Sequence, residues 1–114
     1  MSIRGKKWFV TDRYGNKIYL TTERWQHIIK FHPELIDHFD RVLDTLKTGR
    51  RRQKPLTPNE YKYLKSCDTL PMHYNAILVV VAFTQRTLPD GTVIANNFVK
   101  TAWGVYTHRF DRGS

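Results

Sequence analysis

Cysteine is almost absent from this chain, which has only Cys67 among its 114 residues. One cysteine cannot form an internal disulfide, and it excludes zinc sites that need several cysteines. Long apolar runs are also missing, since the longest, ILVVVAF at 77–83, is far shorter than the ~18 residues of a membrane-spanning helix. The start of the chain shows no apolar signal segment. We therefore expect a cytoplasmic protein without a membrane partner, in which residues 77–83 form a buried strand.

Acidic residues are scarce too. The chain has 10 Asp and Glu against 19 Lys and Arg, so its net charge is +9 and its isoelectric point is near 9.9. Such a surplus on a small domain attracts polyanions, of which nucleic acid is the commonest in a cytoplasm. The interpretation that needs no ligand is a basic surface that is simply solvated. Charge alone distinguishes neither RNA from DNA nor an enzyme from a binding protein.

The length and composition indicate one folded domain covering residues 1–114. The mass of 13.5 kDa provides one core but not two, and 40% hydrophobic residues with 13% aromatics are typical of a globular protein. Both ends are polar, so we expect residues 1–7 and 108–114 to be flexible. No internal repeat or low-complexity segment is visible.

Short-range patterns predict the order of the elements. Residues 8–10 and 17–20 flank the turn-forming Tyr14-Gly15-Asn16 and should form a hairpin. Helices are expected at 21–32 and at about 34–48, with Gly49 as a left-handed cap of the second. Prolines at 55 and 58 indicate an extended or turning connection through 50–58. Strands should follow at 60–65, 74–85 and 92–106, the last two joined by the turn Leu88-Pro89-Asp90-Gly91.

This order predicts an α+β fold. Two N-terminal helices should pack on an antiparallel sheet of three to four strands, preceded by the short β-hairpin. The helices must cover one face of the sheet because their apolar stripes have no other place to be buried. The other face is then free to be polar and basic, which would provide a groove for a ligand.

The first expected helix, TTERWQHIIKFHPEL at 21–35, carries two histidines. Successive residues of a helix are ~100° apart, so His32 falls with Trp25 and Ile28 on the apolar face, and His27 falls on the polar face. The two histidines are ~140° apart, which prevents a straight helix from directing both into one site. His32 lies at the helix C-terminus, where the helix dipole stabilises a protonated ring, so it would suit an acid. His27 would suit a base or an RNA contact. The alternative for His32 is a core histidine without a catalytic role, and for His27 it is an exposed surface histidine.

The last expected strand contains Val99-Lys100-Thr101-Ala102-Trp103. If no bulge intervenes, alternation places Thr101 with Val99 and Trp103 on one face and Lys100 on the other. A hydroxyl beside a cation in the middle of a sheet could bind a phosphate. Thr101 can equally be no more than a good strand former.

The two short motifs, His27 with His32-Pro33-Glu34 and the final VKTAW, resemble the phage- and plasmid-type nucleases. These belong to the superfamily that groups barnase, EndoU, colicin-type tRNases and RelE toxins, the BECR nucleases. The resemblance covers roughly residues 18–106. It implies a helix packed on an antiparallel sheet, metal-independent RNA cleavage, a toxin or phage-defence role and a cognate antitoxin. The residues it carries over as catalytic are His27, His32 and Thr101.

Metal-free RNA cleavage needs a base for the 2′-hydroxyl, an acid for the departing 5′-oxygen and fixed positive charge at the phosphorane. We therefore expect no cofactor and no metal ligand. The expected phosphate-binding cations are Arg51, Arg52, Lys54 and Lys100. The aromatic residues available to stack an unpaired base are Tyr61, Tyr63, Tyr74 and Trp103.

Two other interpretations remain open at this stage. The first is a non-catalytic RNA- or DNA-binding module that uses the same basic face. The second is a metal-dependent DNA nuclease, because Asp44 and the Glu60-Tyr61-Lys62 sequence mimic the acidic residue and E-x-K of those enzymes. Against the second, Asp44 is expected in a helix and not on a partner strand.

Overall fold

The computed structural model describes residues 6–108, so most of the two ends expected to be flexible (1–7 and 108–114) lies outside the described residues. The chain begins with a hairpin of β1 (Lys7–Thr11) and β2 (Lys17–Thr21), followed by helix α1 (Thr22–Phe31). A 3₁₀ turn, η1 (Pro33–Leu35), leads to helix α2 (Phe39–Thr48). The remaining elements are strands β3 (Arg50–Lys54), β4 (Thr57–Ser66), β5 (Ala76–Thr87) and β6 (Val93–Val105).

All the strands belong to one mixed sheet with the order β1-β2-β6-β5-β4-β3. Among the strands of residues 6–108, the one parallel pairing joins β2 to β6 at Ile18↔Asn97 and Tyr19↔Phe98. The predicted α+β class is confirmed. The expected antiparallel sheet of three to four strands was wrong in size and in strand direction, because the N-terminal hairpin and residues 50–54 both add strands to it and β2 pairs parallel with β6.

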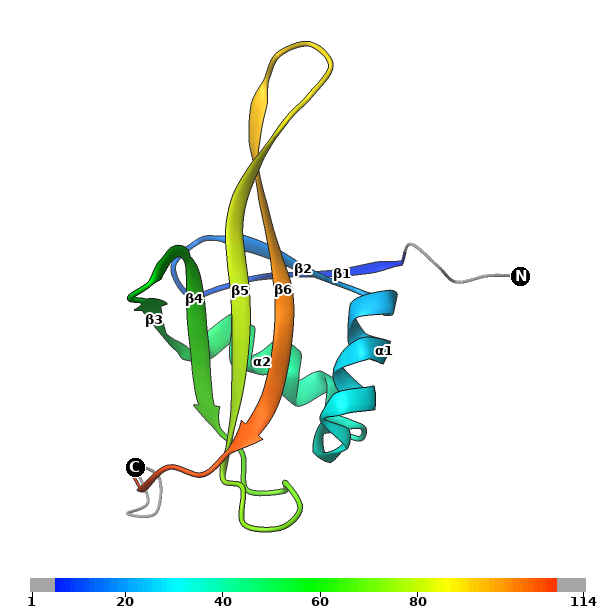
Figure 1. Ribbon diagram of the computed structural model, residues 1–114, viewed down its shortest axis with the longest axis vertical. Helices are drawn as coiled ribbons and strands as arrows, with labels where there is room; N and C mark the ends of the chain where they lie inside the picture. Colours follow the sequence, from blue (N-terminus) through cyan, green and yellow to red (C-terminus); the bar gives the residue numbers. More distant parts are fainter. Residues whose placement is uncertain (1–5, 109–114) are drawn as a thin grey trace, which may run out of the picture.

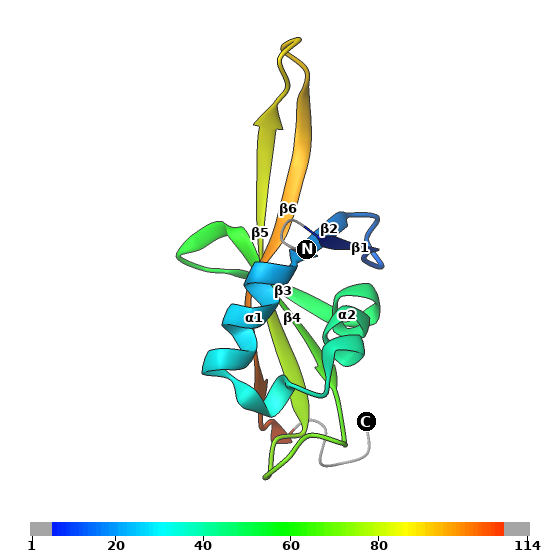
Figure 2. The same cartoon turned by 90° about the vertical axis from the view of Figure 1, so that its right-hand side faces the viewer.

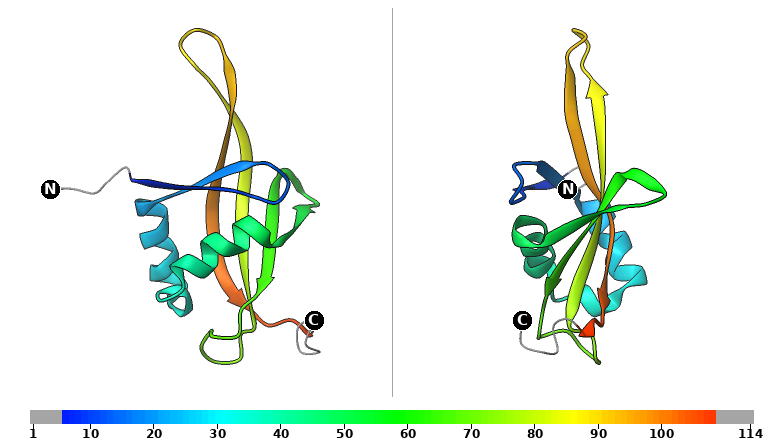
Figure 3. Two further views of the ribbon diagram at one scale, coloured as in Figure 1. Left: turned by 180° about the vertical axis from the view of Figure 1, so that it is seen from behind. Right: turned by 90° about the vertical axis from the view of Figure 1, so that its left-hand side faces the viewer.

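The helices do not share the sheet equally. Figure 1 shows α2 crossing behind β4, β5 and β6, whereas α1 stands beside the lower half of β6. In the side view, α2 and the β1–β2 hairpin lie together on one side of these strands, whereas α1 lies at the β6 edge and extends past it toward the other side (Figure 2). The same layering is seen from behind in Figure 3. Among residues 6–108, α2 thus covers one face of the sheet, and the opposite face is flanked by α1 only at the β6 edge.

The core lies between α2, α1 and the covered face of the sheet. Alternate residues of β5 point into it, and apolar residues of both helices meet them. Its fully buried members include Ile28, Leu35, Val42, Leu46, Tyr63, Ile77, Val79 and Val81. Burying one such aliphatic side chain contributes roughly 1.5–3 kcal/mol, so this layer fixes which face of the sheet is left open.

The second helix differs from its prediction at both ends. It begins at Phe39 and not at 34, because Pro33–Leu35 form a separate 3₁₀ turn. Gly49 has an extended backbone, φ −69° and ψ 159°, and not the expected left-handed one. A Cβ at Gly49 would lie 2.4 Å from the Thr45 carbonyl oxygen and 3.0 Å from that of Leu64. Glycine is therefore required there by the close approach of α2 to β4.

Residues 50–54 form an edge strand, where we predicted a connection. β3 pairs antiparallel with β4 from Arg50↔Leu64 to Gln53↔Tyr61, and the register shifts before Lys54. An edge strand tolerates charged side chains well, since they discourage pairing with other chains. The structure thus places a run of cations within the sheet itself.

The hairpin of β5 and β6 extends well beyond the other strands, at the top of Figure 1. The last residues of β5 that pair with β4 are near Ala82, and β2 meets β6 only at Asn97 and Phe98. Among the described residues, the part of the hairpin beyond these points is a two-stranded arm. Its tip contains Gly91 with φ +89°, as the predicted turn requires.

Candidate nucleic-acid interface

Strand register divides the residues of the sheet between the covered face and an open face, the one turned away from α2. On β4, Tyr61 and Tyr63 pair with core residues of β5 on the covered side. The open face therefore carries the alternate residues of β4, which are Glu60, Lys62 and Leu64. Its members on β3 and β5 are Arg50, Arg52, Leu78, Val80 and Ala82.

A bulge in β6 changes which residues of that strand reach the open face. Val81 pairs with Val99 but Val80 pairs with Thr101, so Lys100 is the extra residue. Val99 is consequently buried in the core, while Thr101 and Trp103 lie on the open face, half-buried. The prediction that Val99, Thr101 and Trp103 share a face is wrong, because it assumed that no bulge intervenes. The bulge places Thr101 on the open face.

A basic hollow opens on β3, β4 and β5. Its volume is about 330 Å³, and it is lined by Arg50, Arg51, Arg52, Lys62, Leu64, Leu78 and Thr107. The side chains of Arg50, Arg52 and Lys62 belong to the open face by register. Within residues 6–108 none of these three has a carboxylate within ion-pair distance. The hollow therefore combines an apolar floor with cations that are not neutralised by the described part of the chain.

Lys54 and Lys100 have a different environment from the cations of the hollow. Both form ion pairs with Glu60, Lys54 at 3.0 Å and Lys100 at 2.5 Å. The Lys100 hydrogen bond and then the Lys54 hydrogen bond lower the pKa of the Glu60 carboxyl. Lys54, Lys100 and Glu60 together keep one net positive charge, and the Lys100–Glu60 pair connects the β6 bulge to β4. Both lysines were predicted as phosphate contacts, and in this structure both are ion-paired with Glu60.

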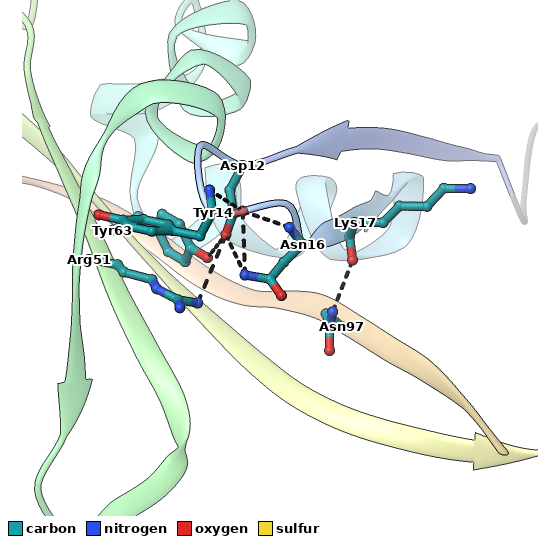
Figure 4. Close-up of polar contacts among 7 residues, drawn as sticks. All are labelled: Asp12, Tyr14, Asn16, Lys17, Arg51, Tyr63 and Asn97. Atoms are coloured by element: carbon teal, nitrogen blue, oxygen red, sulfur yellow. Dashed lines mark hydrogen bonds and ion pairs between the residues drawn. The ribbon is translucent and has the colours of Figure 1, made fainter.

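Arg51 points to the covered face, although Arg51 and Arg52 are adjacent in sequence. Its guanidinium lies 4.4 Å from the ring centre of Tyr14 and 4.3 Å from that of Tyr61, and one of its nitrogens is 3.9 Å from Asp12. Asp12 also accepts a hydrogen bond from the Tyr63 hydroxyl (Figure 4). Because alternate residues of β3 face opposite sides, Arg51 is separated from Arg50 and Arg52. It serves this internal network and is enclosed by aromatic rings.

Three of the tyrosines predicted to stack a base are also on the covered side. Tyr63 is completely buried, and the ring of Tyr61 is half-buried against Phe83, 5.0 Å between ring centres. Tyr74 packs over Gly104, where a Cβ would lie 3.1 Å from its ring. These tyrosines build the core and its border. Trp103 is the one predicted stacking residue that the structure places on the open face.

The two helix histidines are separated, as their angular spacing predicted. His27 is exposed on the outer side of α1, with its ring 4.8 Å from that of Phe31. His32 ends the helix, and its ring lies 5.8 Å from Trp103. His32 thus reaches the border of the open face at Trp103, which is two residues from Thr101 along β6.

Glu34 lies close to His32 and is held by the backbone of β6. One carboxylate oxygen of Glu34 accepts a hydrogen bond of 2.8 Å from the Gly104 N–H on β6. The same oxygen lies 4.0 Å from His32 Nδ1, and the His32 side chain is 34% exposed. This separation is within ion-pair distance but is too long for a hydrogen bond. Glu34 belongs to the His-Pro-Glu motif, but no role was predicted for it from the sequence.

The residues of the metal-nuclease interpretation are divided between two places. Glu60 and Lys62 share the open face, as alternation predicted, but Glu60 is held by two lysines. Asp44 on α2 pairs with Lys65 at the edge of the covered face. Among the described residues, no group of three or more His, Cys, Asp or Glu side chains could hold a metal ion. The three parts of that motif do not form one site.

Arg50 and Lys62 are cations of the basic hollow that were not predicted as phosphate contacts. Recognition of β3 as a strand would have found Arg50, because alternation then places it with Arg52. That signal was hidden by the prolines at 55 and 58, which lie in the β3–β4 turn and at the start of β4. Lys62 was considered only as part of the E-x-K motif.

Comparison with protein-family models, with curated proteins and with solved structures found no match to this chain. None of the helices between residues 6 and 108 is long and apolar enough to cross a bilayer. The resemblance to BECR nucleases therefore stays a prediction, and any function must be argued from the residues of the open face and its border.

Proposed function

We propose that this protein is a metal-independent endoribonuclease that binds single-stranded RNA across the open face of its sheet. The observation that carries the proposal is the basic hollow beside Trp103, Thr101 and His32. Three cations without carboxylate partners among the described residues, an aromatic ring, a hydroxyl and an imidazole belong to, or border, the open face. The cations and the imidazole would provide two of the functions that RNA cleavage without a metal requires, fixed positive charge and one group for proton transfer.

Binding would depend mainly on Arg50, Arg52 and Lys62. Arginine can hold a phosphate through two parallel hydrogen bonds, and the apolar floor of the hollow lowers the competition from water. Trp103, half-buried on the same face, offers an indole on which an unpaired base can stack. A ribonuclease toxin of this kind would be neutralised by an acidic antitoxin that covers the same cations.

For the chemical step, His32 is the group that exchanges a proton. Histidine titrates near neutral pH, which suits transfer to the departing 5′-oxygen or from the 2′-hydroxyl. Glu34 would hold the ring in one orientation, and the cations of the hollow would stabilise the charge on the phosphorane. The Thr101 hydroxyl would donate a hydrogen bond to a phosphate oxygen. The 2′-hydroxyl loses its proton and its oxygen attacks phosphorus, the bond to the 5′-oxygen breaks, and that oxygen takes up a proton, so a 2′,3′-cyclic phosphate and a 5′-hydroxyl remain. His32 would transfer one of these two protons and water the other.

The test is incubation of the purified protein with total RNA in EDTA. We expect cleavage that leaves 2′,3′-cyclic phosphate and 5′-hydroxyl ends, because no step uses a metal. Cleavage that appears only when Mg²⁺ is added would contradict the proposal and favour a metal-dependent nuclease that uses Glu60 and Lys62. Intact RNA that nevertheless binds would identify a binding module.

That binding module is the second candidate, and one observation favours it. Only one of the two helix histidines lies near the open face, so an acid–base pair of histidines is not assembled among the described residues. Binding needs only the cations and the rings, which are present in either case. The products of the EDTA incubation separate the two candidates.

The contribution of the hollow can be measured with a charge-matched pair of variants. Replacing Arg50 and Arg52 with glutamine should weaken binding of a single-stranded oligonucleotide more than tenfold at about 0.1 M salt. It should also reduce the slope of log K against log [salt] by about 1.4, because each phosphate contact on a single strand contributes about 0.7. The measurement is a fluorescence anisotropy titration at several salt concentrations.

The matched control replaces Arg41 and Lys47, both exposed on α2, with glutamine. It removes the same charge from the far side of the molecule. We expect a small loss of affinity and a nearly unchanged slope. Equal effects of the two double variants would mean that net charge, and not the hollow, binds the nucleic acid.

A further inference from the structure

An aromatic row on the outer side of the N-terminal hairpin has no part in the proposed reaction. It consists of Phe9 on β1, Tyr19 on β2 and Phe98 on β6. The ring centres of Phe9 and Tyr19 are 5.8 Å apart, and those of Tyr19 and Phe98 are 6.1 Å apart. Because Phe98 pairs with Ala82, it belongs to the open face. The row therefore continues from that face onto the hairpin.

The row is accessible, although three neighbouring aromatic rings would normally be buried. Phe9 is 53% exposed, and Tyr19 and Phe98 are half-buried. The alternate residues of the same strands, Trp8 and Leu20, turn inward and pack in or against the core. The fold therefore already uses one side of the hairpin for packing. The outer rings are not needed to fill the core.

Lysines accompany each exposed ring of the hairpin. The Lys7 ammonium lies 4.5 Å from the centre of Tyr19, and that of Lys17 lies 4.7 Å from the centre of Phe9. Neither β1 nor β2 contains an acidic residue. Exposed cation–π contacts are weak, about 0.5–1 kcal/mol, so a base can replace either lysine on its ring. The displaced ammonium then remains close enough to bind the adjacent phosphate.

A small hollow adjoins the row at the start of α1. Its volume is about 160 Å³, and its lining is Tyr19, Thr21, Arg24, Phe98 and Val99. Arg24 is exposed and adds a third cation beside the rings. The hollow thus supplies a recess next to two aromatic rings and a guanidinium.

We infer that Phe9, Tyr19 and Phe98 form a second subsite for single-stranded nucleic acid, which stacks bases on the rings and holds phosphates with Lys7, Lys17 and Arg24. A row of aromatic residues interleaved with cations is the usual composition of a surface that binds single strands. A protein partner is the less suitable occupant, because lysine is depleted in protein–protein interfaces. The subsite rests on the proposed function in one respect, since it extends the same strand beyond the open face.

The effect of this subsite should depend on the length of the strand. An oligonucleotide of about four nucleotides would fill the basic hollow alone, whereas one of about 12 would reach the aromatic row as well. Stacking on one aromatic side chain is worth a fivefold or larger change in affinity. The wild-type protein should therefore bind the longer strand more tightly than the shorter one, and the row should be the source of the difference.

The experiment uses 2′-O-methyl oligouridines of these two lengths, which have no free 2′-hydroxyl and cannot be cleaved by 2′-oxygen attack. Phe9→Leu keeps an apolar side chain on β1 but removes the ring. It should weaken binding of the longer oligonucleotide at least fivefold and leave binding of the shorter one unchanged. Phe31→Leu is the matched control, because Phe31 is 59% exposed on α1 and outside the row. Thermal melting of both variants checks that the hairpin still folds.

Ultraviolet cross-linking of the longer strand to the wild-type protein, mapped by mass spectrometry, locates the subsite directly. Cross-links at Phe9 or Tyr19, together with the length-dependent loss in Phe9→Leu, are the expected result. Cross-links confined to residues 50–64 and Trp103, with unchanged binding by Phe9→Leu, would overturn the subsite and leave the proposed function standing. Absence of binding by the wild-type protein would overturn both.

Discussion

Replacing Asp12 with alanine is expected to lower the free energy of unfolding by about 3 kcal/mol, the cost of removing one partner from a buried ion pair. The Asp12 side chain is fully buried under the turn of the β1–β2 hairpin. Chemical denaturation at neutral pH, with the midpoint and slope both fitted, would measure the loss. In equilibrium terms this is about a hundredfold more unfolded protein.

The magnitude follows from the number of groups that depend on this carboxylate. Asp12 accepts hydrogen bonds from the backbone N–H groups of Tyr14 and Asn16, at 2.9 and 2.8 Å, and from the Tyr63 hydroxyl. It also pairs with Arg51, as Figure 4 shows. Without Asp12, the hydroxyl and the guanidinium would lose their anionic partner inside the protein. Each such unsatisfied group costs about 1–3 kcal/mol.

Asp90 provides the control, since it has the same local role at an exposed turn. Its carboxylate accepts a hydrogen bond of 2.9 Å from the Thr92 N–H, as Asp12 does from Tyr14 N–H. Asp90→Ala should leave the denaturation midpoint almost unchanged, because the freed groups remain in contact with water. If the two variants lost equal stability, turn formation alone would explain the role of Asp12, and the contacts with Tyr63 and Arg51 would contribute little.

The same carboxylate predicts how stability depends on pH. Burial acts to raise the pKa of Asp12, but the hydrogen bonds from Tyr63, Asn16 and Tyr14 lower it further, so the net shift is downward. Its stabilisation is therefore complete above the unfolded-state pKa of about 3.9 and is lost as the pH falls through the lower folded-state value. Asp12→Asn should therefore reduce the loss of unfolding free energy at acid pH. If that loss were unchanged in the variant, other carboxyl groups would be responsible for it.

Local patterns predicted those parts of the fold that local chemistry decides. Thr21 caps α1 by accepting a hydrogen bond of 3.1 Å from the Arg24 N–H, as the two threonines suggested. The turns at Gly15 and Gly91 have the positive φ that only glycine adopts easily. The separation of His27 from His32 follows from helix geometry alone. Each of these features depends on residues that are close in sequence.

Apart from the 3₁₀ turn at Pro33–Leu35, the main features that sequence reasoning missed depend on contacts between distant segments. The bulge at Lys100 is coupled to an ion pair with Glu60, forty positions earlier in the chain. Arg51 is placed on the covered face by its pairing with Tyr63 and by Asp12 in the first hairpin. A run of four cations in five residues resembles a loop until the β4 partner is known. Prediction of the open face therefore required the strand register, which no local pattern determines.

The largest expected effect on activity concerns the one helix histidine that reaches the border of the open face. His32→Ala should lower the rate of RNA cleavage about 100-fold or more, since a positioned proton donor or acceptor contributes ~10²–10⁴-fold. Binding of an uncleavable oligonucleotide should change little, because the cations of the hollow remain. Single-turnover cleavage and anisotropy titrations measure the two quantities separately.

Two further variants identify which groups act with His32. Thr101→Val keeps a β-branched residue in β6 but removes the hydroxyl from the open face, and we expect at least a tenfold slower reaction with unchanged melting. Glu34→Gln keeps an acceptor for the Gly104 N–H but removes the charge beside His32 Nδ1. Its effect should be intermediate and should disappear in the His32→Ala background, because Glu34 acts only through that ring.

His27→Ala is the decisive comparison, as it removes a histidine from the same helix. His27 contacts Phe31 on the outer side of α1, away from Trp103, so the cleavage rate should stay within about twofold of the wild type. If His27→Ala abolished cleavage and His32→Ala did not, the reaction would have to occur on the outer side of the helix, beside the hollow of Thr21, Glu23, Arg24 and His27. Binding by the open face would then position the RNA, and the chemistry would lie at the other end of the strand.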